Sequence, residues 1–314
     1  MPNQREKAPD AAKTKRRGDN KLVFAVPSLL TTGNIFCGFY SITESLLGSQ
    51  ALSLHDITSA TEHFDRAAIN IGFAYLFDAL DGRIARMTGA TTEFGVELDS
   101  IADVASFGIA PALLAFAWGY GTIPQLHRIA WAVSFVFVVS GALRLARFNV
   151  QARRPSQNLP LKNPKIDKKA FVGMPIPAGA ALLAAIVHFW PVPLIASDLS
   201  FSLGGRTIGI DSMALGIGLL ILMACLALLM VSTIRYSSFK GVGAGKYHPR
   251  VLVLALTLVV VAIWFYSRWT LLILSVTYVS HGVVSKAWSL LRAWRKGGST
   301  DHSRLELDEP HRSH

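Results

Sequence analysis

Four aspartates stand at helical spacing inside otherwise apolar stretches of the chain. Asp78 and Asp81 are three residues apart and Asp99 and Asp103 are four apart, within FDALDGRIARMTGATTEFGVELDSIADVASFG. A carboxylate at membrane depth must be paired, bound to metal or neutralised, because removing its charge from water is costly. Neighbouring carboxylates also repel one another, and hard divalent ions such as Mg²⁺ or Mn²⁺ relieve that repulsion. The spacing therefore predicts a metal site, and a pair of ions suits displacement at phosphorus.

Small and cationic residues accompany these acids. At about 100° of rotation per residue, one helical face carries Asp78, Asp81, Gly82, Ala85 and Arg86. Gly95 precedes Asp99 by four residues on the facing helix. Gly82 and Ala85 leave room for a ligand beside the backbone, and the Arg86 guanidinium suits phosphate. The short turn MTGATTE makes the two helices antiparallel neighbours, so the pattern predicts transfer of a phosphate-linked group.

The composition predicts that these helices lie in a membrane. Hydrophobic residues make up 51% of the 314 residues, and charged residues only 16%, against roughly 25% in soluble domains. The formal net charge is +11, but the basic residues lie in short stretches between apolar segments, as the positive-inside rule describes. We therefore expect a lipid bilayer, and no nucleic acid, as the partner of the basic surface.

Eight apolar stretches approach the ~20 residues that a helix needs to cross a bilayer. They are 23–48, 67–87, 94–119, 128–148, 174–197, 213–233, 250–266 and 270–292. Basic connections alternate with weakly charged ones, such as the predicted connection 49–66. The fold class is thus an all-α integral membrane protein with about eight spans. Both termini and the aspartates are expected on the cytoplasmic side of a bacterial cytoplasmic membrane.

The same pattern divides the chain into four parts. We expect a disordered basic cytoplasmic tail over 1–21 and a transmembrane core over 22–240. A cytoplasmic loop with two extra transmembrane helices follows over 241–293, and a polar cytoplasmic tail completes the chain over 294–314.

The order D-x2-D-G-x2-A-R-x8-G-x3-D-x3-D, from Asp78 to Asp103, resembles the signature of the CDP-alcohol phosphatidyltransferase family at every fixed position. The resemblance implies a core of six transmembrane helices, usually dimeric, with a metal site between the second and third. It also implies a reaction in which an alcohol hydroxyl attacks the β-phosphorus of a CDP-activated lipid and releases CMP. The last two helices would lie outside that six-helix core.

The resemblance also implies roles for single residues. Asp78, Asp81 and Asp99 would be the principal metal ligands. Asp103 would lie near a second metal ion and act as general base. The CDP-lipid would be bound by a set that shares some of these residues: Asp78, Asp81, Gly82, Ala85, Arg86, Gly95 and Asn34. Asn34, inside the first helix, either points toward the nucleotide or forms a hydrogen bond between helices.

Other segments resemble the phosphatidylserine synthase branch of this family. They are PSLLTTGNIFCGF, DSIADVASFGIAPA, RLARFN at 144–149, FVGMPIPA at 171–178 and MVSTIRYSSFK at 230–240. That branch uses CDP-diacylglycerol and L-serine. A serine carboxylate requires cationic donors, for which the candidates are Arg144, Arg147, Asn149 and Lys240. All four lie at expected cytoplasmic helix ends, where topology alone also places basic residues.

Two other functions remain open at this point. A phosphatidyltransferase could use another alcohol, such as glycerol 3-phosphate, an inositol phosphate or choline, and a phosphorylated acceptor would need more cations. A cation-coupled transporter could use the acids as a relay, but it would place them near the bilayer midplane. Asp81 and Asp99 instead lie within about three turns of the expected cytoplasmic helix ends, which favours chemistry at the membrane surface.

Overall fold

The computed structural model describes residues 21–88, 92–153, 171–197, 199–203, 206–232, 235–236 and 249–297. Within these residues the protein is helical apart from two small antiparallel sheets. The predicted all-α class is confirmed. Most of the two predicted tails, and Lys240, lie outside the described residues.

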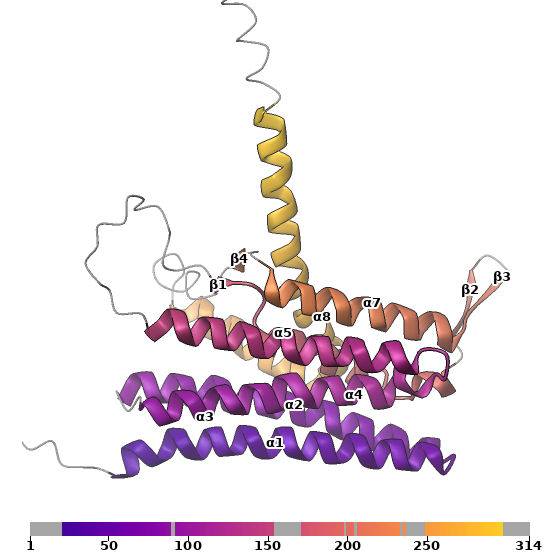
Figure 1. The fold of residues 1–314 in the computed structure, drawn as a ribbon, viewed down its shortest axis with the longest axis horizontal. Helices are drawn as coiled ribbons and strands as arrows, with labels where there is room; N and C mark the ends of the chain where they lie inside the picture. The colour runs from indigo at the N-terminus through magenta and orange to yellow at the C-terminus, as the bar shows by residue number, and fades with distance from the viewer. Residues whose placement is uncertain are drawn as a thin grey trace, which may run out of the picture.

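The helices that form the body of the molecule follow one another along the chain. They are α1 (Lys21–Ser53), α2 (Ile57–Thr88), α3 (Glu93–Asp103), α4 (Ala110–Trp118), α5 (His127–Arg153), α6 (Ile176–Phe189), α7 (Ser212–Val231) and α8 (Pro249–Gly297). A π-helical turn, η1 (Val104–Ile109), joins α3 to α4, and two 3₁₀ turns are η2 (Tyr120–Thr122) and η3 (Leu194–Ala196). In Figure 1, α1, α2, α5 and α7 run alongside one another across the view.

The six predicted core segments each correspond to a helical segment, with α3, η1 and α4 together forming the third. Five stretches are long and apolar enough to cross a membrane: Glu93–Trp118, His127–Val150, Ile176–Ala196, Ser212–Val231 and Thr257–Ser285. The protein is therefore a multi-pass membrane protein. Helices α1 and α2 have 33 and 32 residues, which is also enough length for a span, although polar residues interrupt both.

The connection predicted for 49–66 is much shorter in the structure. Helix α1 continues to Ser53, and α2 already begins at Ile57. Asp56 caps α2, since its carboxylate accepts from the Ser59 amide at 3.0 Å and from the Ser59 hydroxyl at 2.7 Å. These hydrogen bonds hold the pKa of Asp56 below its usual value, and the one from the Ser59 amide contributes most. Most of this segment is therefore helical, although hydropathy alone assigns it to a loop.

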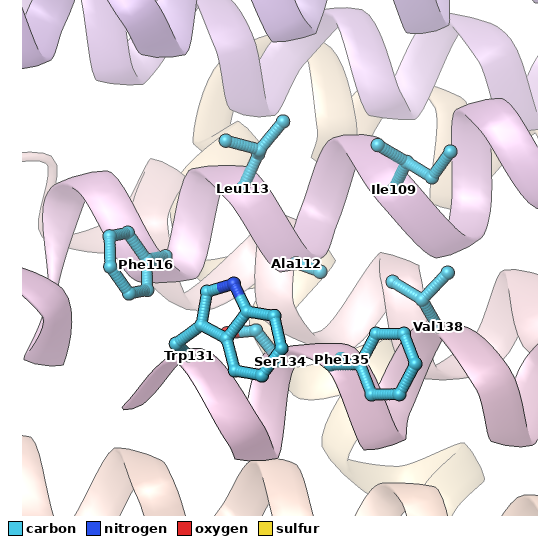
Figure 2. Close-up of a pocket in the computed structure, with 8 residues that line it drawn as sticks. All are labelled: Ile109, Ala112, Leu113, Phe116, Trp131, Ser134, Phe135 and Val138. Carbon is cyan, nitrogen blue, oxygen red and sulfur yellow. The ribbon is translucent and has the colours of Figure 1, made fainter. Parts of the chain in front are cut away.

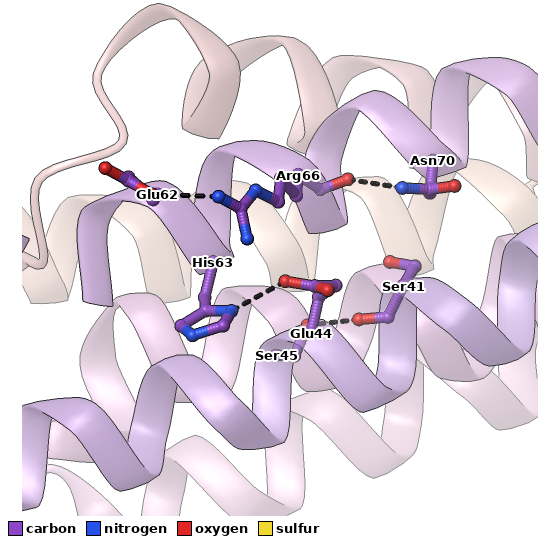
Figure 3. Close-up of polar contacts among 7 residues, drawn as sticks. All are labelled: Ser41, Glu44, Ser45, Glu62, His63, Arg66 and Asn70. Carbon is purple, nitrogen blue, oxygen red and sulfur yellow. Dashed lines mark hydrogen bonds and ion pairs between the residues drawn. The ribbon is translucent and has the colours of Figure 1, made fainter. Parts of the chain in front are cut away.

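Polar side chains join α1 to α2 in this region, as Figure 3 shows. The Ser41 hydroxyl donates to the Ala67 carbonyl at 2.8 Å. Nδ1 of His63 lies 2.7 Å from a carboxylate oxygen of Glu44, which is buried. Burying a carboxylate is tolerated when such a partner is present, so this contact fixes the pairing of the two helices.

The two last predicted spans, 250–266 and 270–292, correspond to two helical arms of α8, which meet at a sharp kink. Helix α8 has non-helical dihedral angles at Tyr266, φ −136° and ψ 47°. The Thr270 hydroxyl donates to the Ala262 carbonyl at 3.0 Å across this kink. In Figure 1 the C-terminal part of α8, in yellow, extends away from the direction of the other helices. The kink at Tyr266 therefore separates two helical arms, at the end of the first predicted span.

Two small sheets lie at the ends of helices. Strands β2 (Leu199–Leu203) and β3 (Arg206–Ile210) form a hairpin before α7. Strands β1 (Phe171–Val172) and β4 (Arg235–Tyr236) pair before α6 and after α7. This second pairing brings together two segments that the sequence separates by more than sixty residues.

Candidate active site

Three of the four predicted aspartates meet between α2 and α3. One carboxylate oxygen from each of Asp78, Asp99 and Asp103 lies within 4.8 Å of the others. Helix α3 is started by Thr92, whose hydroxyl accepts from the Gly95 amide at 3.0 Å, and from there the spacing of four residues stacks Asp99 and Asp103 on one face. Asp103 is the last residue of α3, and η1 follows it directly. Such π-helical turns often occur beside functional residues.

Two oxygens of this cluster have no hydrogen-bond partner in the described part of the chain. Oδ1 of Asp99 and Oδ1 of Asp103 are buried and accept no hydrogen bond from the described residues. A buried polar atom without a partner is destabilising and calls for an explanation such as an ion. Three convergent carboxylates are the oxygen ligands that hard divalent cations prefer. The cluster therefore fits a divalent metal ion.

Asp81 lies outside that group of three oxygens. It is buried, and its Oδ2 accepts a hydrogen bond of 2.9 Å from the Thr31 hydroxyl of α1. The sequence predicts one metal site from all four aspartates, and the structure brings oxygens of three together, while Asp81, within electrostatic range of Asp99, contacts α1. Thr31 was not among the predicted site residues, because no spacing rule connects positions fifty residues apart.

The predicted nucleotide-binding residues of α2 occupy its last turns. Helix α2 ends at Thr88. A side chain added at Gly82 would meet the Arg86 guanidinium nitrogens at 3.7 and 3.8 Å, so Arg86 extends over Gly82. The Arg86 charge also lies within electrostatic range of Asp78 and Asp99. This end of α2 therefore places a cation beside the carboxylates, next to positions without bulky side chains.

Asn34 is fully buried in α1, one turn after Thr31. Neither polar atom of its side chain has a hydrogen-bond partner among the described residues. Its backbone carbonyl accepts from the Ser106 hydroxyl of η1 at 3.0 Å. The two helices approach closely here, because a side chain at Gly38 would lie 2.3 Å from the Ser106 oxygen. A buried amide without protein partners is a candidate ligand contact.

The three candidate acceptor residues that the structure describes differ in their surroundings. Arg144 is half-buried, its buried Nε has no hydrogen-bond partner within the described part of the chain, and its charge lies within electrostatic range of Asp103. The Asn149 amide donates to the Ser100 hydroxyl of α3 at 2.8 Å. Arg147 is exposed. Two of the four, Arg144 and Asn149, therefore lie against α3.

The segments FVGMPIPA and MVSTIRYSSFK, which the resemblance singled out separately, meet in space. The Met174 amide donates to the Leu229 carbonyl at 3.0 Å, beside the pairing of β1 with β4. Gly173 has φ +86°, and a side chain there would lie 2.3 Å from the Met230 carbonyl oxygen. Only glycine combines that dihedral angle with this close approach, which explains the glycine in the first segment.

An apolar groove runs between α4 and α5 (Figure 2). It has a volume of about 260 Å³ and is lined by Ile109, Ala112, Leu113, Phe116, Trp131, Ser134, Phe135 and Val138. Trp131 and Phe135 stack with parallel rings, 5.6 Å apart. Ile109 follows Asp103 by six residues, or about 9 Å of helix, so the groove begins close to the carboxylate cluster.

Comparisons with known proteins point to one family. A model of the CDP-alcohol phosphatidyltransferase family matches residues 24–217. A CDP-diacylglycerol–serine O-phosphatidyltransferase of Helicobacter pylori is 34% identical over 235 residues, which are 74% of this chain and 79% of that protein. A protein of the same name from Methanocaldococcus jannaschii is 32% identical over 68% of this chain and 81% of its own length. Another, from Saccharomyces cerevisiae, is 35% identical over 55% of this chain and 57% of its own length.

Proposed function

The chain belongs to the CDP-alcohol phosphatidyltransferase family, and we propose that it transfers the phosphatidyl group of CDP-diacylglycerol to L-serine, giving phosphatidylserine and CMP. The observation that carries the proposal is the group of buried carboxylate oxygens that lack a hydrogen-bond partner among the described residues, at the positions of the family signature. The names of the relatives from three organisms support serine as the acceptor.

The family generally uses a divalent metal ion, and the acidic cluster could hold one. We propose Mg²⁺ or Mn²⁺, in a site of two ions, with Asp78, Asp81, Asp99 and Asp103 as ligands. When bound, the ions offset the charge of the diphosphate and favour departure of CMP. Asp81 differs from the other three because it already accepts the Thr31 hydroxyl, which orients its carboxylate.

The CDP part would contact the end of α2 and the buried side of α1. Gly82 and Ala85 allow the nucleotide to approach the helix backbone, and Arg86 offers a cation to its phosphates. Gly95 keeps the start of α3 free of a side chain. The donor and the acceptor atom of the Asn34 amide both lack a partner within the described ranges, which suits a cytosine edge or a ribose hydroxyl.

In the proposed step, Asp103 accepts the proton of the serine hydroxyl as that oxygen attacks the β-phosphorus. The new oxygen–phosphorus bond forms while the bond to the CMP oxygen breaks, so no covalent enzyme intermediate is required. Asp103 has a buried oxygen that accepts no hydrogen bond from the described residues, and a base must reach the proton that it removes. Arg144, within electrostatic range of Asp103, is placed to attract the serine carboxylate, with Arg147, Asn149 and Lys240 as further acceptor residues.

The apolar groove between α4 and α5 offers a place for an acyl chain of CDP-diacylglycerol. Its lining is almost entirely apolar, and it begins about 9 Å of helix from Asp103. We further propose that the protein resides in a bacterial cytoplasmic membrane with both termini cytoplasmic, because the positive-inside rule assigns the alternate basic stretches of the sequence to the cytoplasm. A homodimer is the proposed assembly.

The decisive experiment incubates the purified protein with CDP-diacylglycerol, Mn²⁺ or Mg²⁺, and a panel of labelled alcohols. CMP release and lipid products are measured for serine, glycerol 3-phosphate, an inositol phosphate and choline. Serine-dependent CMP release with phosphatidylserine as product is expected. Turnover of another alcohol with none of serine would contradict the acceptor assignment, and absence of CMP release with every alcohol would contradict phosphatidyl transfer.

A further inference from the structure

Two neighbouring threonines of α1 have different surroundings. Thr32 is exposed, and its hydroxyl donates to the Ser28 carbonyl of the preceding turn at 2.8 Å. Such bonds within a helix are common for threonine. Thr31 is buried, and its hydroxyl donates to Oδ2 of Asp81 on α2 at 2.9 Å. Thr31 therefore joins α1 to one of the four signature aspartates.

The chemistry of the two groups shows what this hydrogen bond does. An ionised carboxylate only accepts hydrogen bonds, so the Thr31 hydroxyl is the donor. Asp81 is only 4% exposed, and a donor to a buried carboxylate both stabilises and orients it. In metal sites, hydrogen-bond partners of this kind hold the ligating side chains in place. The Thr31 contact therefore has the form of a support for a metal ligand.

Asp81 is the signature aspartate that most needs such a support. It lies outside the group of three convergent oxygens, but within electrostatic range of Asp78 and Asp99. Aspartate turns about two side-chain bonds, and the second torsion angle is broadly distributed. Because like charges repel, an unsupported Asp81 carboxylate would turn away from the cluster. The Thr31 hydroxyl limits that movement.

Close packing fixes the part of α1 that carries Thr31. A side chain at Gly33 would lie 3.2 Å from the Phe77 ring of α2. A side chain at Gly38 would lie 2.3 Å from the hydroxyl oxygen of Ser106 in η1. Contacts this close leave little room for α1 to shift against α2 and η1. The Thr31 hydroxyl is therefore held on a rigid element, as a positioning group must be.

We propose that Thr31 is a positioning residue for the metal site, whose hydroxyl holds the Asp81 carboxylate in the orientation that suits metal binding. Thr31 acts through Asp81 and does not contact the ion itself. This inference rests on the proposed function, since it assumes that Asp81 is a metal ligand. It makes metal affinity depend on α1 as well as on α2 and α3, which carry the acids.

The first test measures Mn²⁺ binding to the purified protein by electron paramagnetic resonance, without nucleotide or serine. Thr31→Val keeps the branched shape and removes the hydroxyl, so the Mn²⁺ dissociation constant should rise on the order of 10-fold. Thr31→Ser retains a hydroxyl and should restore most of the affinity. Thr32→Val, the same change at the neighbouring exposed position, should bind Mn²⁺ as wild type does. Unchanged binding in Thr31→Val, or equal weakening in Thr31→Val and Thr31→Ser, would overturn the inference.

Ser41→Ala separates positioning from helix packing. The buried Ser41 hydroxyl donates to the Ala67 carbonyl at 2.8 Å, between the same two helices. Ala67 precedes Asp81 by fourteen residues, or about 21 Å of helix. Ser41→Ala and Thr31→Val should both lower the thermal unfolding midpoint, but only Thr31→Val should weaken Mn²⁺ binding. Equal weakening in both variants would assign the effect to packing of α1 and overturn the proposal.

The kinetics should show the same selectivity. In Thr31→Val, the Mn²⁺ concentration for half-maximal activity should rise in parallel with the dissociation constant. Serine KM, measured at saturating Mn²⁺, should remain that of wild type, because Thr31 acts on the metal site and not on the acceptor. A raised serine KM with an unchanged Mn²⁺ dependence would contradict the positioning role.

These results are distinguishable from failure of the proposed function. If the wild-type protein binds no Mn²⁺, or releases no CMP with serine, the proposed function fails before any variant is compared. If the wild-type protein binds Mn²⁺ and uses serine, and Thr31→Val matches it in Mn²⁺ affinity, only the present inference fails.

Discussion

Acidic side chains occur at both ends of α2, in different surroundings. Near Thr88, the carboxylates of α2 and α3 face one another, and Oδ1 of Asp99 and Oδ1 of Asp103 have no hydrogen-bond partner among the described residues. Near Ile57, Glu44 meets His63 at 2.7 Å (Figure 3). In the same region Asp65 meets His188 at 2.6 Å.

The difference shows which acids are structural and which await a ligand. A buried carboxylate with a histidine partner is already compensated, and its role is to join helices. A buried carboxylate oxygen with only other carboxylates nearby is compensated when a cation binds. Substitutions at the two ends should therefore affect different properties: catalysis and metal binding at one end, stability at the other.

The largest effect is expected for Asp103→Asn. An amide retains the shape but cannot accept the hydroxyl proton, and a positioned base contributes about 10²- to 10⁴-fold to rate. Turnover should fall by at least about 100-fold, whereas CDP-diacylglycerol binding, measured by nucleotide displacement, is retained. Glu44→Gln serves as the control and should keep most of its turnover. Near-normal turnover of Asp103→Asn would exclude this residue as the base.

Asp78→Asn should act on metal dependence. Removing one of three convergent carboxylates removes a ligand and a charge, so the Mn²⁺ concentration for half-maximal activity should rise, on the order of 10- to 100-fold as for lost metal-site partners. Direct Mn²⁺ binding by electron paramagnetic resonance should weaken in parallel, and a chelator should abolish wild-type activity. A metal titration that matches wild type would show that Asp78 is not a ligand.

The same contrast explains how far the sequence could predict the structure. Apolar stretches located the six core segments, and the spacing of Asp99 and Asp103 placed them on one face, because both depend on helix periodicity. Helical periodicity gives the face of a residue but not the neighbour that covers it. The bond between Thr31 and Asp81 therefore could not be foreseen.

The end of α2 near Ile57, where acids meet histidines, was less predictable still. Hydropathy assigned residues 49–66 to a connection, because the acids and histidines there reduce the apolar character. The structure places most of them on α2, and Asp65 there is compensated by a partner that is distant in sequence, since His188 is 123 residues away. Such contacts follow only from tertiary packing.

A smaller effect is expected for Glu44→Gln, near the Ile57 end of α2, where this carboxylate meets His63. The amide loses the charge-assisted contact with His63 inside the α1–α2 pair, and a hydrogen bond of this kind contributes about 1.5–3 kcal/mol. The thermal unfolding midpoint in detergent should fall, while serine KM and metal dependence remain those of wild type. A changed metal dependence would mean that the two ends are not independent.

The smallest effect is expected for Asp56→Ala, which removes the cap of α2 in the connection after α1. Because the pKa of Asp56 is lowered in the folded protein, its carboxylate stabilises the fold above its unfolded pKa, and that contribution is lost as the pH falls through the folded pKa. At neutral pH the unfolding midpoint should decrease by less than in Glu44→Gln. The difference from wild type should shrink as the pH falls below 4. Ser59→Ala, which removes only the hydroxyl donor, should give part of the same decrease, and a pH-independent difference for Asp56→Ala would show that the carboxylate charge does not stabilise the helix.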